Sequence, residues 1–141
     1  MPWVEVYNLR NDSVHIAQVQ KATLTTEESG LAPGHGLFGS PEWWKAIDEG
    51  EIPTITIHGH IARTYMGSMN DWPEVEVEAN GNKTQWTRYG ADSLYEVGRP
   101  IEIKYVLQKW RTKRLDRVLG EFSKVALTMR VSAPDTEDFE K

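Results

Sequence analysis

Residues 74–86 read EVEVEANGNKTQW, and this stretch decides the predicted fold class. Glutamate and valine alternate, which is typical of a strand with one solvent-facing side and one buried side. Asn80-Gly81 follows, and this pair is the strongest short hairpin signal because a type I′ turn needs positive φ at both central residues. A turn at that point places Trp86 on the valine side of the returning strand. We therefore predict a tight antiparallel hairpin.

Alternation of apolar and polar residues extends on both sides of this hairpin, from residue 54 to residue 132. The first run contains Gly59, where a bulge or a sharp bend is sterically cheapest. Two later runs cover 101–108 and 124–131, and a short helical turn is expected before them. This order predicts a mainly β fold, a small five-stranded antiparallel barrel that is OB-like or SH3-like.

The first part of the chain is predicted to be an extension with one short helix. Ser40 suits the N-cap of that helix, Pro41 suits its first position and Gly50 suits the C′ position after its end. A candidate strand or hairpin and a glycine-rich loop precede the helix. The predicted organisation is an extension packed on the barrel (1–53), the barrel (54–132) and an acidic, flexible tail (133–141).

Composition excludes several classes of protein. The chain has 141 residues, no cysteine and a formal net charge of −5, so one domain without disulfides, thiol nucleophiles or cysteine-bound zinc is expected. No apolar run approaches the roughly 18 residues of a membrane helix. An acid stands near the N-terminus where a signal peptide would carry basic residues. We therefore expect a cytoplasmic protein that does not interact with membranes.

The most prominent charge cluster lies between the last two predicted strands. Residues 109–117 carry five basic side chains, one acid and a tryptophan. In an OB-type barrel this connection flanks the ligand face, together with the loop between the first two strands. We therefore predict a binding surface made of Trp72, Lys109, Trp110, Arg111, Lys113 and Arg114.

Three functional hypotheses follow from these features. The leading one is a non-catalytic module that binds a protein partner or associates with itself. The alternative places single-stranded nucleic acid or another polyanion on the same basic loop, because aromatic rings stack on bases and cations neutralise phosphates. A solvated hairpin loop would also explain this composition, so the partner stays open.

A third hypothesis, metal-assisted hydrolysis, rests on two histidines. His58 and His60 lie two apart on a predicted strand, so both could point to one side and share a metal ion. Gly59 between them invites a bulge that would break this geometry. Histidines on a polar strand face are more often solvated, so we expect no metal, no cofactor and a binding protein rather than an enzyme.

Overall fold

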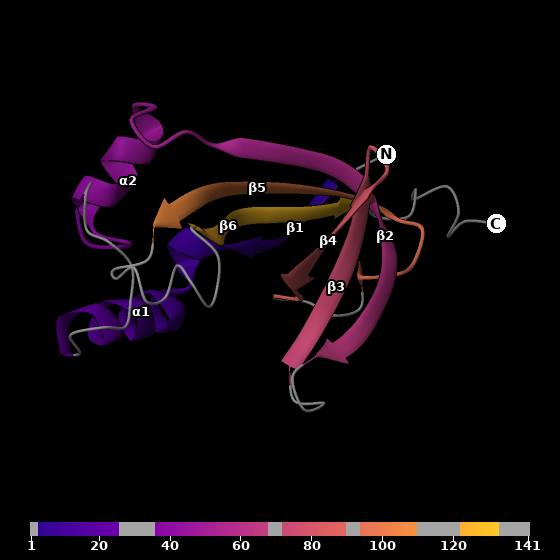
Figure 1. Ribbon diagram of the computed structural model, residues 1–141, viewed down its shortest axis with the longest axis horizontal. Helices are drawn as coiled ribbons and strands as arrows, with labels where there is room; N and C mark the ends of the chain where they lie inside the picture. Colours follow the sequence, from indigo (N-terminus) through magenta and orange to yellow (C-terminus); the bar gives the residue numbers. More distant parts are fainter. Residues whose placement is uncertain (1–2, 26–35, 68–71, 90–93, 110–121, 133–141) are drawn as a thin grey trace. The chain divides into compact units, whose positions relative to one another are not determined.

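The computed structural model describes residues 3–25, 36–67, 72–89, 94–109 and 122–132. Within these ranges the strands form one sheet of six antiparallel strands, in the order β1-β6-β5-β2-β3-β4 (Figure 1). The elements are β1 (Trp3–Asn8), the 3-10 turn η1 (Leu9–Asn11), α1 (Ser13–Thr25), α2 (Pro41–Asp48), β2 (Ile55–Gly67), β3 (Trp72–Ala79), β4 (Asn82–Thr87), β5 (Pro100–Lys109) and β6 (Phe122–Ser132).

The mainly β prediction is confirmed, but the five-stranded barrel is wrong because the sheet is open. β1 and β4 stand at the two ends of the strand order. β1 pairs antiparallel with β6, from Trp3 opposite Ser132 to Asn8 opposite Thr128. In a closed barrel, β6 would have used this edge to pair with another strand of the barrel. The N-terminal strand occupies that edge instead.

The predicted hairpin is confirmed residue by residue. β3 and β4 pair from Ala79 opposite Asn82 to Glu74 opposite Thr87. Asn80 and Gly81 have φ values of 53° and 81°, as a type I′ turn requires. Trp86 is buried on the valine side of the hairpin, so the alternation identified the core face correctly.

β2 is a long strand that bends along its length (Figure 1). Its pairing with β3 shifts between Ile61 and Arg63, so the bulge lies at Ala62 rather than at the predicted Gly59. Gly59 is required for another reason. A Cβ at this position would lie 2.3 Å from the backbone carbonyl oxygen of Glu78, so only glycine lets the two backbones come this close.

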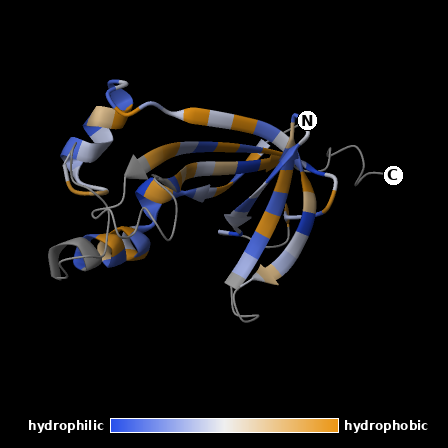
Figure 2. Ribbon diagram, viewed as in Figure 1, coloured by the Kyte–Doolittle hydropathy of each residue, from blue (hydrophilic) through white to orange (hydrophobic). Residues whose placement is uncertain are grey.

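The chain divides into two compact units, which are Met1–Asn8, Thr56–Lys104 and Thr128–Lys141 for unit 1, and Leu9–Ile55 and Tyr105–Leu127 for unit 2. The polar and apolar bands that alternate along the strands give unit 1 its apolar core (Figure 2). Tyr7 stacks on Tyr89 with 4.1 Å between ring centroids, and the Tyr95 hydroxyl donates to the Tyr89 carbonyl. The core of unit 1 includes Ile61, Val75, Val77, Trp86, Tyr95, Ile101, Ile103, Met129 and Val131.

Unit 2 contains the predicted helix, α2, with the predicted caps. The Ser40 hydroxyl accepts a hydrogen bond from the backbone N–H of Trp43, and Gly50 has a φ of 82° after the helix end. Trp43 is fully buried beside Phe38, with 4.7 Å between ring centroids. Trp44 is half-buried under the Arg10 guanidinium. The two adjacent tryptophans therefore point in different directions, as expected for a helix.

A second helix, α1, was not predicted, because apolar residues occur on all its sides. Val14 is exposed whereas Ile16 is half-buried, so no single apolar stripe marks this segment. Its N-cap is Asp12, whose carboxylate accepts from the backbone N–H of His15 at 3.2 Å. The extension thus contains two helices rather than one.

Burial along β5 also differs from what the alternation of apolar and polar residues predicts. Ile101 and Ile103 are buried as predicted, but Val106 is buried and Leu107 is exposed. The strand passes from unit 1 into unit 2 at residue 105, and Val106, on the side opposite to Ile101 and Ile103, is buried. The predicted tail, 133–141, lies outside the described residues, and the boundary at residue 53 stays a prediction.

Gly59→Ala is expected to lower the free energy of unfolding by about 2 kcal/mol, because the added methyl group overlaps the Glu78 carbonyl. Urea denaturation measures this loss. Thr56→Val, an exposed change on the same strand, serves as the control and should stay within about 0.5 kcal/mol of the wild type. A Gly59→Ala variant as stable as the wild type would contradict the close approach.

Candidate functional site

The polar side of the sheet in unit 1 carries most of its charged residues. Pairing of β2, β3 and β4 places the side chains of alternate residues on this side, opposite to the buried valines of β3. We call this surface the outer face. Its members on the three strands are His60, Arg63, Tyr65, Glu74, Glu76, Glu78, Lys83, Gln85 and Thr87.

One network on the outer face is centred on Glu76, which is only 8% exposed. Its Oε2 lies 3.4 Å from Arg63 Nε and accepts a hydrogen bond from Gln85 Nε2 at 3.2 Å. The Arg63 guanidinium also stacks over the Tyr65 ring, 4.2 Å from its centroid. Arg63 is therefore held by a carboxylate from β3 and by an aromatic ring from its own strand.

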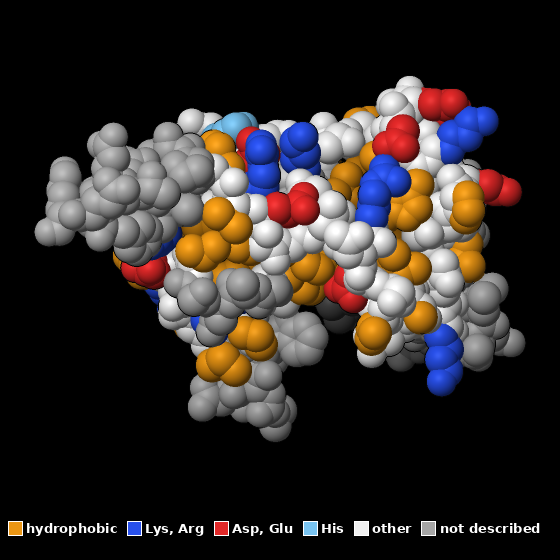
Figure 3. Space-filling view, turned by 180° about the vertical axis from the view of Figure 1, so that it is seen from behind, with side chains coloured by type: hydrophobic (Ala, Val, Ile, Leu, Met, Phe, Trp, Pro, Cys, Tyr) orange, Lys and Arg blue, Asp and Glu red, His pale blue; other side chains and the backbone are white. Residues whose placement is uncertain are grey.

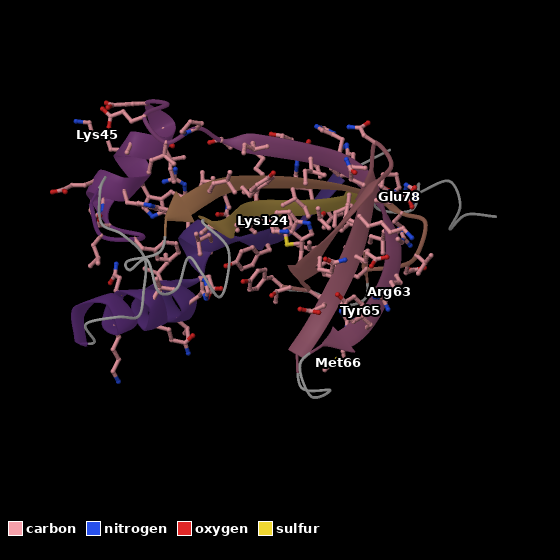
Figure 4. The ribbon with its side chains drawn as sticks, in the orientation of Figure 1. Lys45, Arg63, Tyr65, Met66, Glu78 and Lys124 are labelled. Carbon is pink, nitrogen blue, oxygen red and sulfur yellow. The ribbon has the colours of Figure 1, made fainter. Side chains whose placement is uncertain are left out.

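Tyr65 and Met66 are neighbours on β2 (Figure 4), but only Tyr65 lies on the outer face, because Met66 stands opposite Pro73 on the side of the buried valines. Partial desolvation raises the pKa of the Tyr65 phenol, and a hydrogen bond to Glu74 and the negative charge of that residue raise it further. Arg88 Nη2 donates to the Tyr65 carbonyl at 3.3 Å and lies 3.6 Å from the Met66 sulfur. Met66 is 43% exposed. The Tyr65 ring is thus presented on the outer face, whereas the Met66 thioether lies beside Arg88 on the other side of β2.

A second network in unit 1 is centred on Glu102, which is 6% exposed. Its Oε1 accepts hydrogen bonds from Arg130 Nε at 2.9 Å and from Arg130 Nη2. Its Oε2 lies 3.5 Å from His58 Nε2. The Arg130 guanidinium also lies near the Trp3 ring, 5.9 Å from its centroid. This carboxylate joins β5 to both neighbouring strands.

The two predicted metal ligands do not gather into a metal centre. His58 lies beside Glu102, and His60 stands opposite Glu78 in the strand register. Among the described residues, no group of three or more histidines, aspartates or glutamates is placed to hold a metal ion. The hypothesis of metal-assisted hydrolysis therefore gains no support from this part of the chain.

The predicted basic binding surface lies almost entirely outside the described residues. This applies to Trp110, Arg111, Lys113 and Arg114. Trp72 begins β3 and Lys109 ends β5, but their side chains also fall outside the described part. This surface stays a prediction.

Sequence reasoning missed the contact between Arg63 and Tyr65, although part of the signal was present. The two residues are spaced i, i+2 on a predicted strand, which places them on one side. Their partner Glu76 could not be identified, because the bulge at Ala62 sets which glutamate stands opposite Arg63. Glu76 was expected in solvent and is instead buried.

Charges of both signs are distributed over the molecule. On the side seen in Figure 3, acidic and basic side chains are interspersed with apolar ones rather than collected into a field of one sign. The full chain is nevertheless acidic, with a net charge of −5. The excess of acidic over basic residues gives the chain its negative charge.

Arg130→Met should lower the free energy of unfolding by about 3 kcal/mol, because it leaves the buried Glu102 carboxylate without its two N–H donors. Replacing both partners, Glu102→Leu with Arg130→Met, should recover most of this loss because no buried charge remains. Urea denaturation of the two variants near neutral pH measures the difference. Equal stability of the single variant and the wild type would contradict the network.

The raised pKa of Tyr65 predicts a loss of stability at high pH. The folded state favours the neutral phenol, so this contribution is complete below the ordinary pKa of about 10 and declines as pH rises through the higher folded value. The free energy of unfolding should decrease more between about pH 8 and about pH 11 for the wild type than for Tyr65→Phe. Parallel losses in both proteins would show that the phenol is not desolvated beside Glu74.

No helix in the described ranges is both long enough and apolar enough to cross a membrane. The predicted cytoplasmic location stays a prediction.

Comparison with known proteins adds one finding to this geometry. A search of curated proteins found no match to this chain. A family model described as immunity protein RhsI2 matches residues 4–132, which reach from β1 to the end of β6. This match confirms the coarser prediction of a protein-binding module and lends no support to nucleic acid as the partner. The chain belongs to the RhsI2 immunity protein family.

Proposed function

We propose that this chain binds a protein toxin and neutralises it by forming a stable complex. The observation that carries this proposal is the family match, which spans the whole sheet rather than one motif. An immunity protein acts through its contact with the toxin, so the relevant feature of the chain is a surface that fits a protein. The sequence also predicted self-association. Contact between two copies of the chain does not by itself neutralise a toxin, so toxin binding is the proposal that we argue.

The outer face supports this proposal because it has the composition of a protein interface. Arginine, tyrosine and methionine are enriched in interfaces relative to the rest of protein surfaces. Arg63 and Tyr65 bring two of these residue types together on the outer face of one strand. Their surroundings are polar, which matches the rim of a typical interface.

The basic segment remains a second proposed contact. Trp72, Lys109, Trp110, Arg111, Lys113 and Arg114 combine aromatic and cationic side chains, and arginine and tryptophan are frequent interface hot spots. A cluster of this charge in an acidic chain would suit an acidic region of the toxin. Its contribution is tested separately from that of the outer face.

The proposed function predicts a stable complex with the cognate toxin. Mixing the two purified proteins should give a one-to-one complex with a Kd below about 1 µM, and the chain should suppress toxin activity at equal concentration. Calorimetry and an assay of toxin activity measure the two effects. Full toxin activity at a saturating concentration of the chain would exclude the proposal.

The polyanion alternative is tested in the same series with a single-stranded oligonucleotide. The toxin interpretation predicts no binding, even at about 50 mM salt, where phosphate contacts are strongest. The polyanion hypothesis would be favoured instead if the chain does not bind the toxin but binds the oligonucleotide, with an affinity that falls steeply towards about 200 mM salt.

A further inference from the structure

We propose that the toxin docks on one part of the outer face, centred on the stack of Arg63 over Tyr65, and presents basic groups around an apolar centre. We call this part the Arg–Tyr patch, and its members are Arg63, Tyr65, Glu74, Glu76 and Glu78. The proposal rests on the proposed function, because it names the surface and the partner chemistry of that binding activity.

The centre of the patch is rigid before any partner arrives. Glu76 is nearly buried, and a carboxylate in that position must be paired to offset its desolvation. Arg63 and Gln85 supply this pairing at 3.4 and 3.2 Å. Tyr65 restrains Arg63 from the other side. Binding therefore costs little of the side-chain entropy that a free arginine would lose.

The centre of the patch is also accessible. The Arg63 side chain is 58% exposed although it pairs with Glu76, and Tyr65 is half-buried. The rings and stems of such side chains supply apolar contact area while their polar ends stay hydrogen-bonded. A partner that covers the Tyr65 ring and the stem of Arg63 gains this area without breaking the pair between Arg63 and Glu76.

Local backbone features maintain the edge of the patch. A Cβ at residue 67 would lie 2.3 Å from Oε2 of Glu74, so Gly67 leaves room for this carboxylate. Glu74 in turn hydrogen-bonds the Tyr65 phenol. Arg88 contacts both the Tyr65 carbonyl and the Met66 sulfur from the side of β4. The patch is therefore a built surface rather than a row of solvated strand residues.

Charge complementarity indicates the chemistry of the partner. The patch contains three carboxylates and one guanidinium, and Lys83 stands opposite Glu78 at its margin. Because Arg63 is paired with Glu76, the charge that remains for a partner comes from Glu74 and Glu78. The whole chain has a net charge of −5, which adds a long-range field of the same sign. A basic toxin surface would be attracted by both, which raises its association rate.

The test measures toxin binding by patch variants of the full chain. Arg63→Ala and Tyr65→Ala should each weaken the Kd roughly 30-fold or more, as expected for hot-spot residues. Lys45→Ala, an exposed change on α2 in unit 2, is the control and should bind as the wild type does. Thermal melting of each variant excludes unfolding as the cause, and Tyr65→Phe retains the ring if Tyr65→Ala does not fold.

The charge argument is tested by reversal at two sites. Glu78→Lys and Glu51→Lys change the net charge equally, but Glu51 lies in unit 2. Glu78→Lys should slow association about tenfold at low salt, and Glu51→Lys should have a much smaller effect. Equal rates for the two variants would show that the total charge, and not the patch, attracts the toxin, and this result would overturn the basic-partner argument.

Glu76 is a positioning residue in this proposal, because it acts through Arg63. Glu76→Gln should weaken binding in the wild type but cause no further loss in the Arg63→Ala background. Additive losses in the two backgrounds would contradict this role.

The outcomes separate this proposal from the proposed function. Toxin binding that is unchanged by every patch variant, but lost with Lys113→Glu and Arg114→Glu, would overturn the patch and leave the proposed function intact. No binding by the wild type would overturn both.

Discussion

The close approach of β2 to β3 is the constraint on which the sheet depends. β2 lies between β5 and β3, so its path determines how the two halves of the strand order are joined. At residue 59 the backbones come so near that a Cβ would overlap the Glu78 carbonyl. The bulge at Ala62 then shifts the register and sets Arg63 opposite Glu76. A glycine and a bulge, three residues apart, thus decide which side chains meet on the outer face.

Two carboxylates are nearly buried on the polar side of the sheet, and that register sets the partner of one of them, Glu76. Glu76 and Glu102 each pair with an arginine of a neighbouring strand, Arg63 and Arg130. Removing a carboxylate from water is costly, and a charged hydrogen-bond donor offsets that cost only when it is well placed. Both arginines are therefore held in defined positions, and the polar side of unit 1 becomes a surface with fixed chemistry.

This fixed surface agrees with membership of an immunity protein family. A protein that must bind its partner tightly benefits from side chains that are already in place, because less entropy is lost in the complex. The acidic net charge would assist encounter with a basic partner over distances that exceed direct contact. In the proposed complex, the rigid centre of the patch contributes affinity. Its carboxylates contribute to the association rate and to specificity for a basic toxin surface.

The sequence by itself determined the elements whose signals are local. The hairpin over 74–86 and the capped helix α2 were predicted correctly, because turn residues and caps act within a few positions. The tertiary structure decided the rest. β1 pairs with β6 across 120 or more residues, and no local pattern records such a pairing. Likewise, Glu76 looks like any solvent-facing strand residue until Arg63 and Gln85 from neighbouring strands cover it, because burial depends on what packs against a residue.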